Sequence, residues 1–296
     1  MGGSGLRNTV PIPAWQAEGR RREWSMNIRL CLLPFLALLA GILSRAADAP
    51  VFGFQDFLLV PVRVHLLSSA DTPTLQTTLT GVDVDRIFQK ANRVWAPAGI
   101  QFFVESLHSE PARPAKTTPD PDPTKRVPSG LDAMLQHVPP ASRSAEVFNV
   151  YYIKSFDVNG VYFRHPEAIF VKDTASLRKV EGGIDEPLPR VTSHELGHAF
   201  SLVHRQNTFN LMASGTTGTS LNESEIRQAR ESAATRPWIL SAKTWLEKAA
   251  ALEKDGKAQE ALAVYQRLAA LPVEAAPEVQ SARLKIKTEG KPAAAP

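Results

Sequence analysis

The sequence contains one cysteine in 296 residues, and that residue, Cys31, lies in an apolar segment near the N-terminus. A chain with one cysteine cannot form an internal disulfide bond, so its fold depends on its hydrophobic core or on a bound metal. The formal net charge is only +4, and the basic residues are not gathered into a patch with interleaved aromatic residues. The composition therefore gives no reason to expect nucleic-acid binding.

The sequence also lacks a hydrophobic run of comfortable membrane-spanning length, because the apolar stretch from Leu30 to Leu43 is too short. Within residues 26–49, Arg29 precedes this stretch and small residues ending at Ala49 follow it. This order predicts a secretory signal peptide, export to the periplasm or the extracellular space, and no stable membrane span after cleavage. A retained N-terminal anchor is the alternative.

Residues 1–25 are polar and stand in front of this signal, with Arg20 to Arg22 as a basic cluster and Met26 directly after them. We interpret residues 1–25 as an extension that precedes the true start at Met26. A long, basic first region of the signal peptide is the competing interpretation.

The next residues alternate between strand and helix patterns. Val82–Trp95 has apolar residues three and four apart, which predicts an amphipathic helix. Residues 109–130 are rich in proline and charge, and they predict a solvated surface loop. Strands are predicted from β-branched and aromatic runs at Phe57–Leu67, Ile100–Glu105, Phe148–Lys154 and Ala168–Lys172.

Residues 189–212 contain the motif His194-Glu195-x-x-His198 and a further histidine, His204. Residues four apart lie on one face of a helix, so His194 and His198 can direct their imidazoles at one metal ion. Glu195 is placed to act as general base on a zinc-activated water. If the helix continued, His204 would lie about 120° around it from His198, so the chain must turn between them for His204 to become a third ligand.

These residues resemble the metzincins, whose motif is His-Glu-x-x-His-x-x-Gly-x-x-His followed by a methionine in a tight turn. The resemblance covers roughly residues 57–234. No tyrosine follows the turn, so no tyrosine ligand is expected. The resemblance implies zinc as cofactor, with these matching residues: His194, His198 and His204 as ligands, Glu195 as base and Met212 in the methionine turn.

One position departs from the family pattern, since Ser201 stands where the metzincins have glycine. The resemblance implies a left-handed turn there, which costs a residue other than glycine of order 1–2 kcal/mol. Glu223 is a rival third ligand, similar to the downstream glutamate of thermolysin-like enzymes. Ser220 to Glu223 also has the pattern of a capping box that opens a helix over Glu223–Ala233.

The character of the sequence changes after Pro237. Residues 237–290 resemble one tetratricopeptide repeat unit, with packing residues from Trp245 to Pro272, and residues 291–296 are predicted to be a disordered tail. A single repeat cannot bury its own faces, so this segment either packs on the preceding domain or binds a protein partner.

Together these patterns predict an α+β fold: a metzincin-like domain over residues 50–236, with a twisted mixed sheet and an active-site helix, and a C-terminal helical hairpin. The predicted function is that of a secreted zinc endopeptidase acting on proteins or peptides. The alternative is a non-catalytic zinc-bearing adaptor that binds partners through the C-terminal helices. His165, beside the last predicted strand, is more simply a surface residue than a substrate contact.

Overall fold

The structure is a computed structural model that describes residues 51–114, 130–274, 277 and 279–280, all within one compact unit, Ala49–Pro296. The predicted extension (1–25), the predicted signal segment (26–49) and the tail (291–296) lie outside the described residues, as does most of the proline-rich loop. None of the helices in the described ranges is long and apolar enough to span a membrane.

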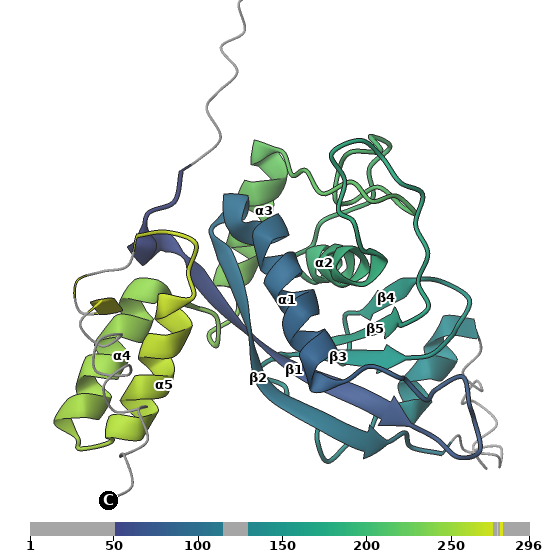
Figure 1. Ribbon diagram of the computed structural model, residues 1–296, viewed down its shortest axis with the longest axis horizontal. Coiled ribbons are helices and arrows are strands. Elements are labelled where there is room, and N and C mark those ends of the chain that lie inside the picture. The colour runs from purple at the N-terminus through teal and green to yellow at the C-terminus, as the bar shows by residue number, and fades with distance from the viewer. Residues whose placement is uncertain (1–50, 115–129, 275–276, 278, 281–296) are drawn as a thin grey trace, which may run out of the picture. The chain divides into compact units, whose positions relative to one another are not determined.

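The core of the fold is a mixed sheet in the order β2-β1-β3-β5-β4 (Figure 1). Strands β2, β1, β3 and β5 run parallel to one another, β4 is antiparallel to β5, and the short β6 pairs with β1. Together with the helices, this sheet confirms an α+β fold. The strands are β1 (Leu58–Ser68), β2 (Ile100–Pro111), β3 (Phe148–Ile153), β4 (Gly160–Phe163), β5 (Ala168–Lys172) and β6 (Leu240–Ser241).

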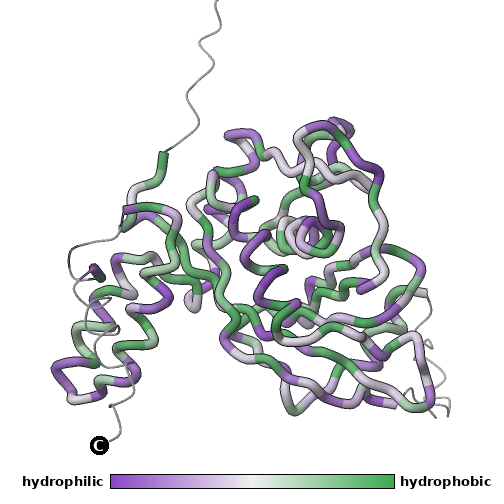
Figure 2. Tube along the Cα trace, viewed as in Figure 1, coloured by the Kyte–Doolittle hydropathy of each residue, from purple (hydrophilic) through white to green (hydrophobic). Residues whose placement is uncertain are grey.

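Hydrophobic residues line both faces of the sheet, because alternate residues of a strand point to opposite faces. On β1, Val60 and Val62 belong to the main core, which includes residues of three helices, whereas Leu67 belongs to a smaller cluster beside the 3-10 helix η3 (Gly130–His137). Figure 2 shows hydrophobic residues concentrated along the strands. The three helices are α1 (Gly81–Trp95), α2 (Pro187–Ala199) and α3 (Glu223–Ala234).

The structure corrects several boundaries. Strand β2 continues through Ser109 to Pro111, so the predicted loop begins later than expected, and η3 already begins at Gly130. Helix α1 begins at Gly81, where Thr80 caps it and Asp83 completes a capping box. Strand β4, which was not predicted, forms one edge of the sheet.

The C-terminal segment forms a hairpin of α4 (Ala242–Lys254) and α5 (Ala258–Ala269). Its buried residues form a hydrophobic cluster with Phe57 and Leu59 from the start of β1 and with the partly buried Phe103 of β2. The hairpin thus packs on the sheet that carries the rest of the fold.

Candidate metal centre

Helix α2 carries most of the residues of the site and is buried along nearly its whole length. Pro187 is its first residue, a position where the absent N–H of proline costs no hydrogen bond within the helix. Thr192 is linked to β3 through a hydrogen bond with the Tyr152 hydroxyl (2.9 Å). This burial holds α2 rigidly against the sheet, so the functional side chains project from a fixed support.

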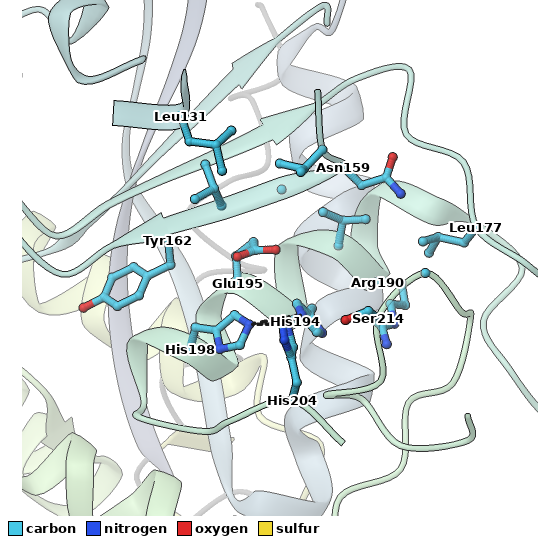
Figure 3. A pocket seen from close by; sticks show the side chains of 15 residues that line it. Leu131, Asn159, Tyr162, Leu177, Arg190, His194, Glu195, His198, His204 and Ser214 are labelled. Atoms are coloured by element: carbon cyan, nitrogen blue, oxygen red, sulfur yellow. Dashed lines mark hydrogen bonds between the residues drawn. The ribbon is translucent and has the colours of Figure 1, made fainter. Parts of the chain in front are cut away.

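His194 and His198 lie one turn apart on α2, and His204 follows in the loop after the helix. The Nε2 atoms of the three rings converge, with 3.1 Å between His194 and His198, 3.1 Å between His198 and His204, and 3.2 Å between His194 and His204. Figure 3 shows the three rings pointing toward one another. The structure therefore brings together the predicted histidines in a cluster that could hold a metal ion.

The chain returns to His204 through a tight reversal at the end of α2. Ser201 N–H donates to His198 C=O and Leu202 N–H donates to Gly197 C=O, both at 2.9 Å. These two hydrogen bonds form a Schellman motif, in which the residue after the helix cap adopts a left-handed conformation. Ser201 has a φ angle of +66°, so the left-handed turn expected at this position is confirmed with serine in place of glycine.

Helix α3 braces this turn. Gln228 Nε2 donates a hydrogen bond to Ser201 C=O (2.6 Å), and the Ser201 and Ser232 hydroxyl oxygens lie 3.2 Å apart. Hydrogen bonds of this kind offset part of the cost of a left-handed serine.

The donor set fits a metal ion such as zinc. His194 Nδ1 lies 2.8 Å from Leu211 C=O, and His198 Nδ1 lies 2.9 Å from Leu202 C=O. A carbonyl oxygen only accepts, so each Nδ1 carries the proton and each Nε2 presents a lone pair to the centre of the cluster. Tetrahedral zinc with Zn–N bonds of about 2.0–2.1 Å separates its nitrogen ligands by roughly 3.3 Å, close to the distances in this cluster.

Electrostatics favour the neutral rings that metal binding requires. Burial, together with the nearby Arg190 charge, lowers the pKa of His194 to about 3. Burial also lowers the pKa of His198. Both imidazoles are therefore neutral near pH 7, which is the form that binds a metal.

Glu195 follows His194 on α2, and only 5% of it is exposed. Burial raises the pKa of its carboxyl to about 8, against an opposing effect of the Arg190 charge. Its carboxylate points from α2 toward β4 and lines the same cavity as the three histidines (Figure 3). The placement lets this carboxylate reach a molecule bound beside the histidine cluster.

Met212 is fully buried beneath α2. A Cβ atom added to Gly197, between the two helical histidines, would lie only 2.5 Å from Met212 Sδ. Asn210 Oδ1 accepts a hydrogen bond from Met212 N–H (2.7 Å), and Met212 C=O accepts one from Arg205 N–H (3.0 Å). Met212, in the predicted methionine turn, thus packs against Gly197 of α2 and is hydrogen-bonded to Arg205, the residue after His204.

Glu223 does not take part in the histidine cluster, since it is exposed at the start of α3. The predicted capping box at Ser220–Glu223 is wrong by two positions: Asn222 caps the helix and Glu225 completes the box. Ser220 instead pairs with the preceding loop, because both its N–H and its hydroxyl donate to Phe209 C=O.

Glu225 has a second role that the sequence did not reveal. Its buried carboxylate accepts hydrogen bonds from Arg205 Nε (2.7 Å) and Asn210 Nδ2 (2.8 Å). These contacts join α3 to the segments that hold His204 and Met212.

Two residues near the histidine cluster were also missed. Arg190, buried on α2, donates hydrogen bonds to the carbonyls of Gly218 (3.1 Å) and Ala213, and so fixes the loop after Met212. Its place four residues before His194 on the same helix face was the available signal. Tyr162 of β4 lines the cavity and donates a hydrogen bond to Glu167 Oε2 (2.7 Å).

A cavity of about 590 Å³ opens over the histidine cluster. His165 is exposed in the turn between β4 and β5 and does not line this cavity. The cavity is bordered by the edge strand β4, helix α2 and the loop after Met212. Its lining includes Asn159, Gly160, Val161, Leu177, Val191, Ser214 and Gly215.

No protein-family model matches the chain, and no curated protein matches it. Among solved structures, the chain is similar to a zinc-dependent peptidase from Methanocorpusculum labreanum, with a TM-score of 0.28 and 13% sequence identity. The similarity covers 58% of this chain and 98% of that chain. At this TM-score, the two chains share too little geometry for the function of one to be transferred to the other.

Proposed function

We propose that the protein is a zinc-dependent endopeptidase of the metzincin type. The observation that carries this proposal is the convergence of three imidazole Nε2 atoms beside a buried carboxylate, next to an open strand edge. In this proposal His194, His198 and His204 hold the metal.

Zinc bound by three imidazoles supplies a Lewis acid for a peptide carbonyl and lowers the pKa of water. Glu195 takes the proton from the attacking water and delivers it to the leaving amine. Its buried setting supports this role, because a carboxyl whose pKa lies near the working pH can both accept and release a proton.

The edge strand β4 supports a peptide as the substrate. Lys172 N–H donates to Asn159 C=O (2.9 Å), so residues 159, 161 and 163 face β5 in this antiparallel pair. The backbone groups of Gly160 and Tyr162 therefore point to the other edge, with which no described strand pairs. An extended peptide can form backbone hydrogen bonds there, and this pairing needs no free chain terminus.

The opposite edge of the sheet, at β2, is protected against pairing with another strand. This contrast supports a role for the open edge at β4 in binding a peptide. On β2, Phe102 C=O accepts a hydrogen bond from Asn92 Nδ2 (2.9 Å) and Phe102 N–H donates to Asn92 Oδ1 (2.8 Å). The pairing of β2 with β1 also shifts register opposite Val62 and Arg63. Proteins protect exposed edges in these ways to prevent unwanted pairing. In the part of the chain that the structure describes, β4 has no such protection beside the cavity.

The test is the variant Glu195→Gln in the purified protein. It should retain about one zinc ion per chain and lose about 10²–10⁴-fold in the turnover of a peptide library, because the ligands persist while proton transfer is lost. Zinc content is measured by elemental analysis and cleavage by mass spectrometry. Glu223→Gln, on the exposed start of α3, is the matched control and should cleave as the wild type does.

Near-wild-type turnover in Glu195→Gln would contradict the proposed mechanism. A wild-type protein that binds zinc and cleaves no peptide would instead support the non-catalytic adaptor.

A further inference from the structure

Gly160, the first residue of β4, lies directly against the side chain of Glu195. A Cβ atom added at Gly160 would lie 2.6 Å from Glu195 Oε1, 2.8 Å from Glu195 Cγ and 2.7 Å from Val191 Cγ1. Non-bonded heavy atoms in a packed interior approach one another to about 3.5–4.0 Å, so a side chain at this position would force Glu195 and Val191 to shift.

The backbone conformation does not explain this glycine, because the φ angle of Gly160 lies outside the left-handed region that favours glycine. Glycine within a strand otherwise marks a close approach by another group. Here the approaching groups belong to α2, and the nearest is the carboxylate of Glu195.

Packing holds this carboxylate in place. The Glu195 carboxylate forms no hydrogen bond with the described residues, and it is buried between α2 and β4. Val191, one turn earlier on α2, lies against the same point of β4. The space over Gly160 therefore sets where the carboxylate rests relative to the histidine cluster.

We infer that Gly160 is a positioning residue for Glu195: the missing side chain provides the space in which the carboxylate sits beside both the histidines and the open strand edge. This inference rests on the proposed peptidase function. Gly160 acts through Glu195, while its own backbone N–H and C=O remain available at the strand edge.

The first test is kinetic and uses the variant Gly160→Ala in the full chain. Its kcat should fall about tenfold or more, because misplacement of a catalytic group by ~1 Å can cost about 10²-fold. Its zinc content and KM should change little, since the ligands and the strand-edge backbone are retained. Gly53→Ala is the matched control, because its added Cβ would lie 3.5 Å from Asp56 Oδ2, an ordinary contact.

The second test needs no enzymatic activity and uses the zinc-free protein. Gly160→Ala should lower the melting temperature by roughly 2–10 °C, as expected for overpacking in a domain of this size. In the Glu195→Ala background the same substitution should lower it by less than half as much, because two of the three clashing atoms, Oε1 and Cγ of Glu195, are gone and only Val191 Cγ1 remains. In the Val191→Ala background most of the loss should remain.

The outcomes separate the two proposals. If the wild type cleaves no peptide, the proposed function fails, and the melting temperatures still test the contact. A wild-type kcat in Gly160→Ala, or an equal loss of melting temperature in the wild-type and Glu195→Ala backgrounds, would overturn the role of Gly160 and leave the peptidase proposal standing. If Gly160→Ala does not fold, recovery of folded protein by adding Glu195→Ala supports the inference, and failure to recover contradicts it.

Discussion

Ser201 occupies the position at which α2 stops being a helix and the chain turns back to His204. Its left-handed backbone is disfavoured for any residue with a side chain, by about 1–2 kcal/mol. The hydrogen bond from Gln228 to its carbonyl and the contact with Ser232 come from α3, which is distant in sequence. At the scale of the residue, the turn is therefore strained, and its support comes from the tertiary fold.

Ser201→Gly tests this strain. Glycine removes the left-handed penalty but has more conformational freedom in the unfolded chain, so the free energy of unfolding should rise by about 0–1 kcal/mol. Chemical denaturation measures the change. Glu231→Gly, at an exposed position of α3, is the control and should lower stability by roughly 0.5–1 kcal/mol. A similar loss in Ser201→Gly would mean that the helix continues through residue 201.

Glu195 gives a pH dependence of stability whose sign follows from its raised pKa. In the unfolded chain this carboxyl titrates near 4.5, and burial raises its pKa to about 8 in the fold. As the pH rises between these values, the unfolded state ionises while the folded state stays protonated, so the wild type loses stability. Glu195→Gln cannot ionise. Its advantage in melting temperature over the wild type, both zinc-free, should widen from about pH 5 to about pH 8 and then level off.

An advantage of Glu195→Gln that stays constant over this pH range would contradict the buried, proton-binding environment assigned to the carboxyl. Zinc must be removed from both proteins for this comparison, because a bound cation favours the ionised carboxylate.

At the scale of elements, α3 organises the C-terminal side of the site. Its buried Glu225 accepts hydrogen bonds from Arg205 and from Asn210. Through its middle and last turns it also supports the left-handed residue after α2. The helix thus links the segments that carry His204 and Met212 without contributing a residue to the histidine cluster.

Alanine variants distinguish the two candidates for the third ligand. His204→Ala should weaken zinc binding sharply, because it leaves a site with two imidazoles, whereas Glu223→Ala should bind zinc as the wild type does. Asn222→Ala, which removes the cap, should retain zinc and lose about 0.5–2 kcal/mol of stability. Calorimetric zinc titration and denaturant unfolding measure these effects. Loss of zinc in Glu223→Ala alone would overturn the proposed metzincin-type site.

At the scale of the whole molecule, the C-terminal hairpin shares a hydrophobic cluster with the start of the sheet. Leu268 of α5 is fully buried in the cluster that contains Phe57 and Leu59 of the β1 region. The hairpin covers apolar surface that the preceding domain would otherwise expose. This packing favours a structural role in capping the domain, while binding of a partner by the hairpin remains a proposal.

Leu268→Ala tests whether the hairpin and the sheet unfold together. The truncation should cost about 2–5 kcal/mol. Calorimetry should show one transition at a lower temperature, because both elements share the same core. The exposed Gln259→Ala on the same helix is the control and should change little. Two separate transitions, of which only one shifts, would instead describe an independent appended module.

The sequence by itself determined the central sheet strands, helix α2 and the histidines that could hold a metal ion. These features depend on local spacing: alternation predicts a strand, and residues four apart share a helix face. The departure at Ser201 was also readable, since the resemblance to the metzincins implies a left-handed turn at the position where serine stands in place of glycine.

The tertiary structure alone decided how the site is supported. Strand β4 is short, with only a Val-Tyr-Phe run after Asn159-Gly160 as its signal, and its position as an open edge depends on pairing with β5. The contact of Gly160 with Glu195 joins residues 35 positions apart. Packing between elements that are distant along the chain follows from their combined shapes, and no local periodicity records it.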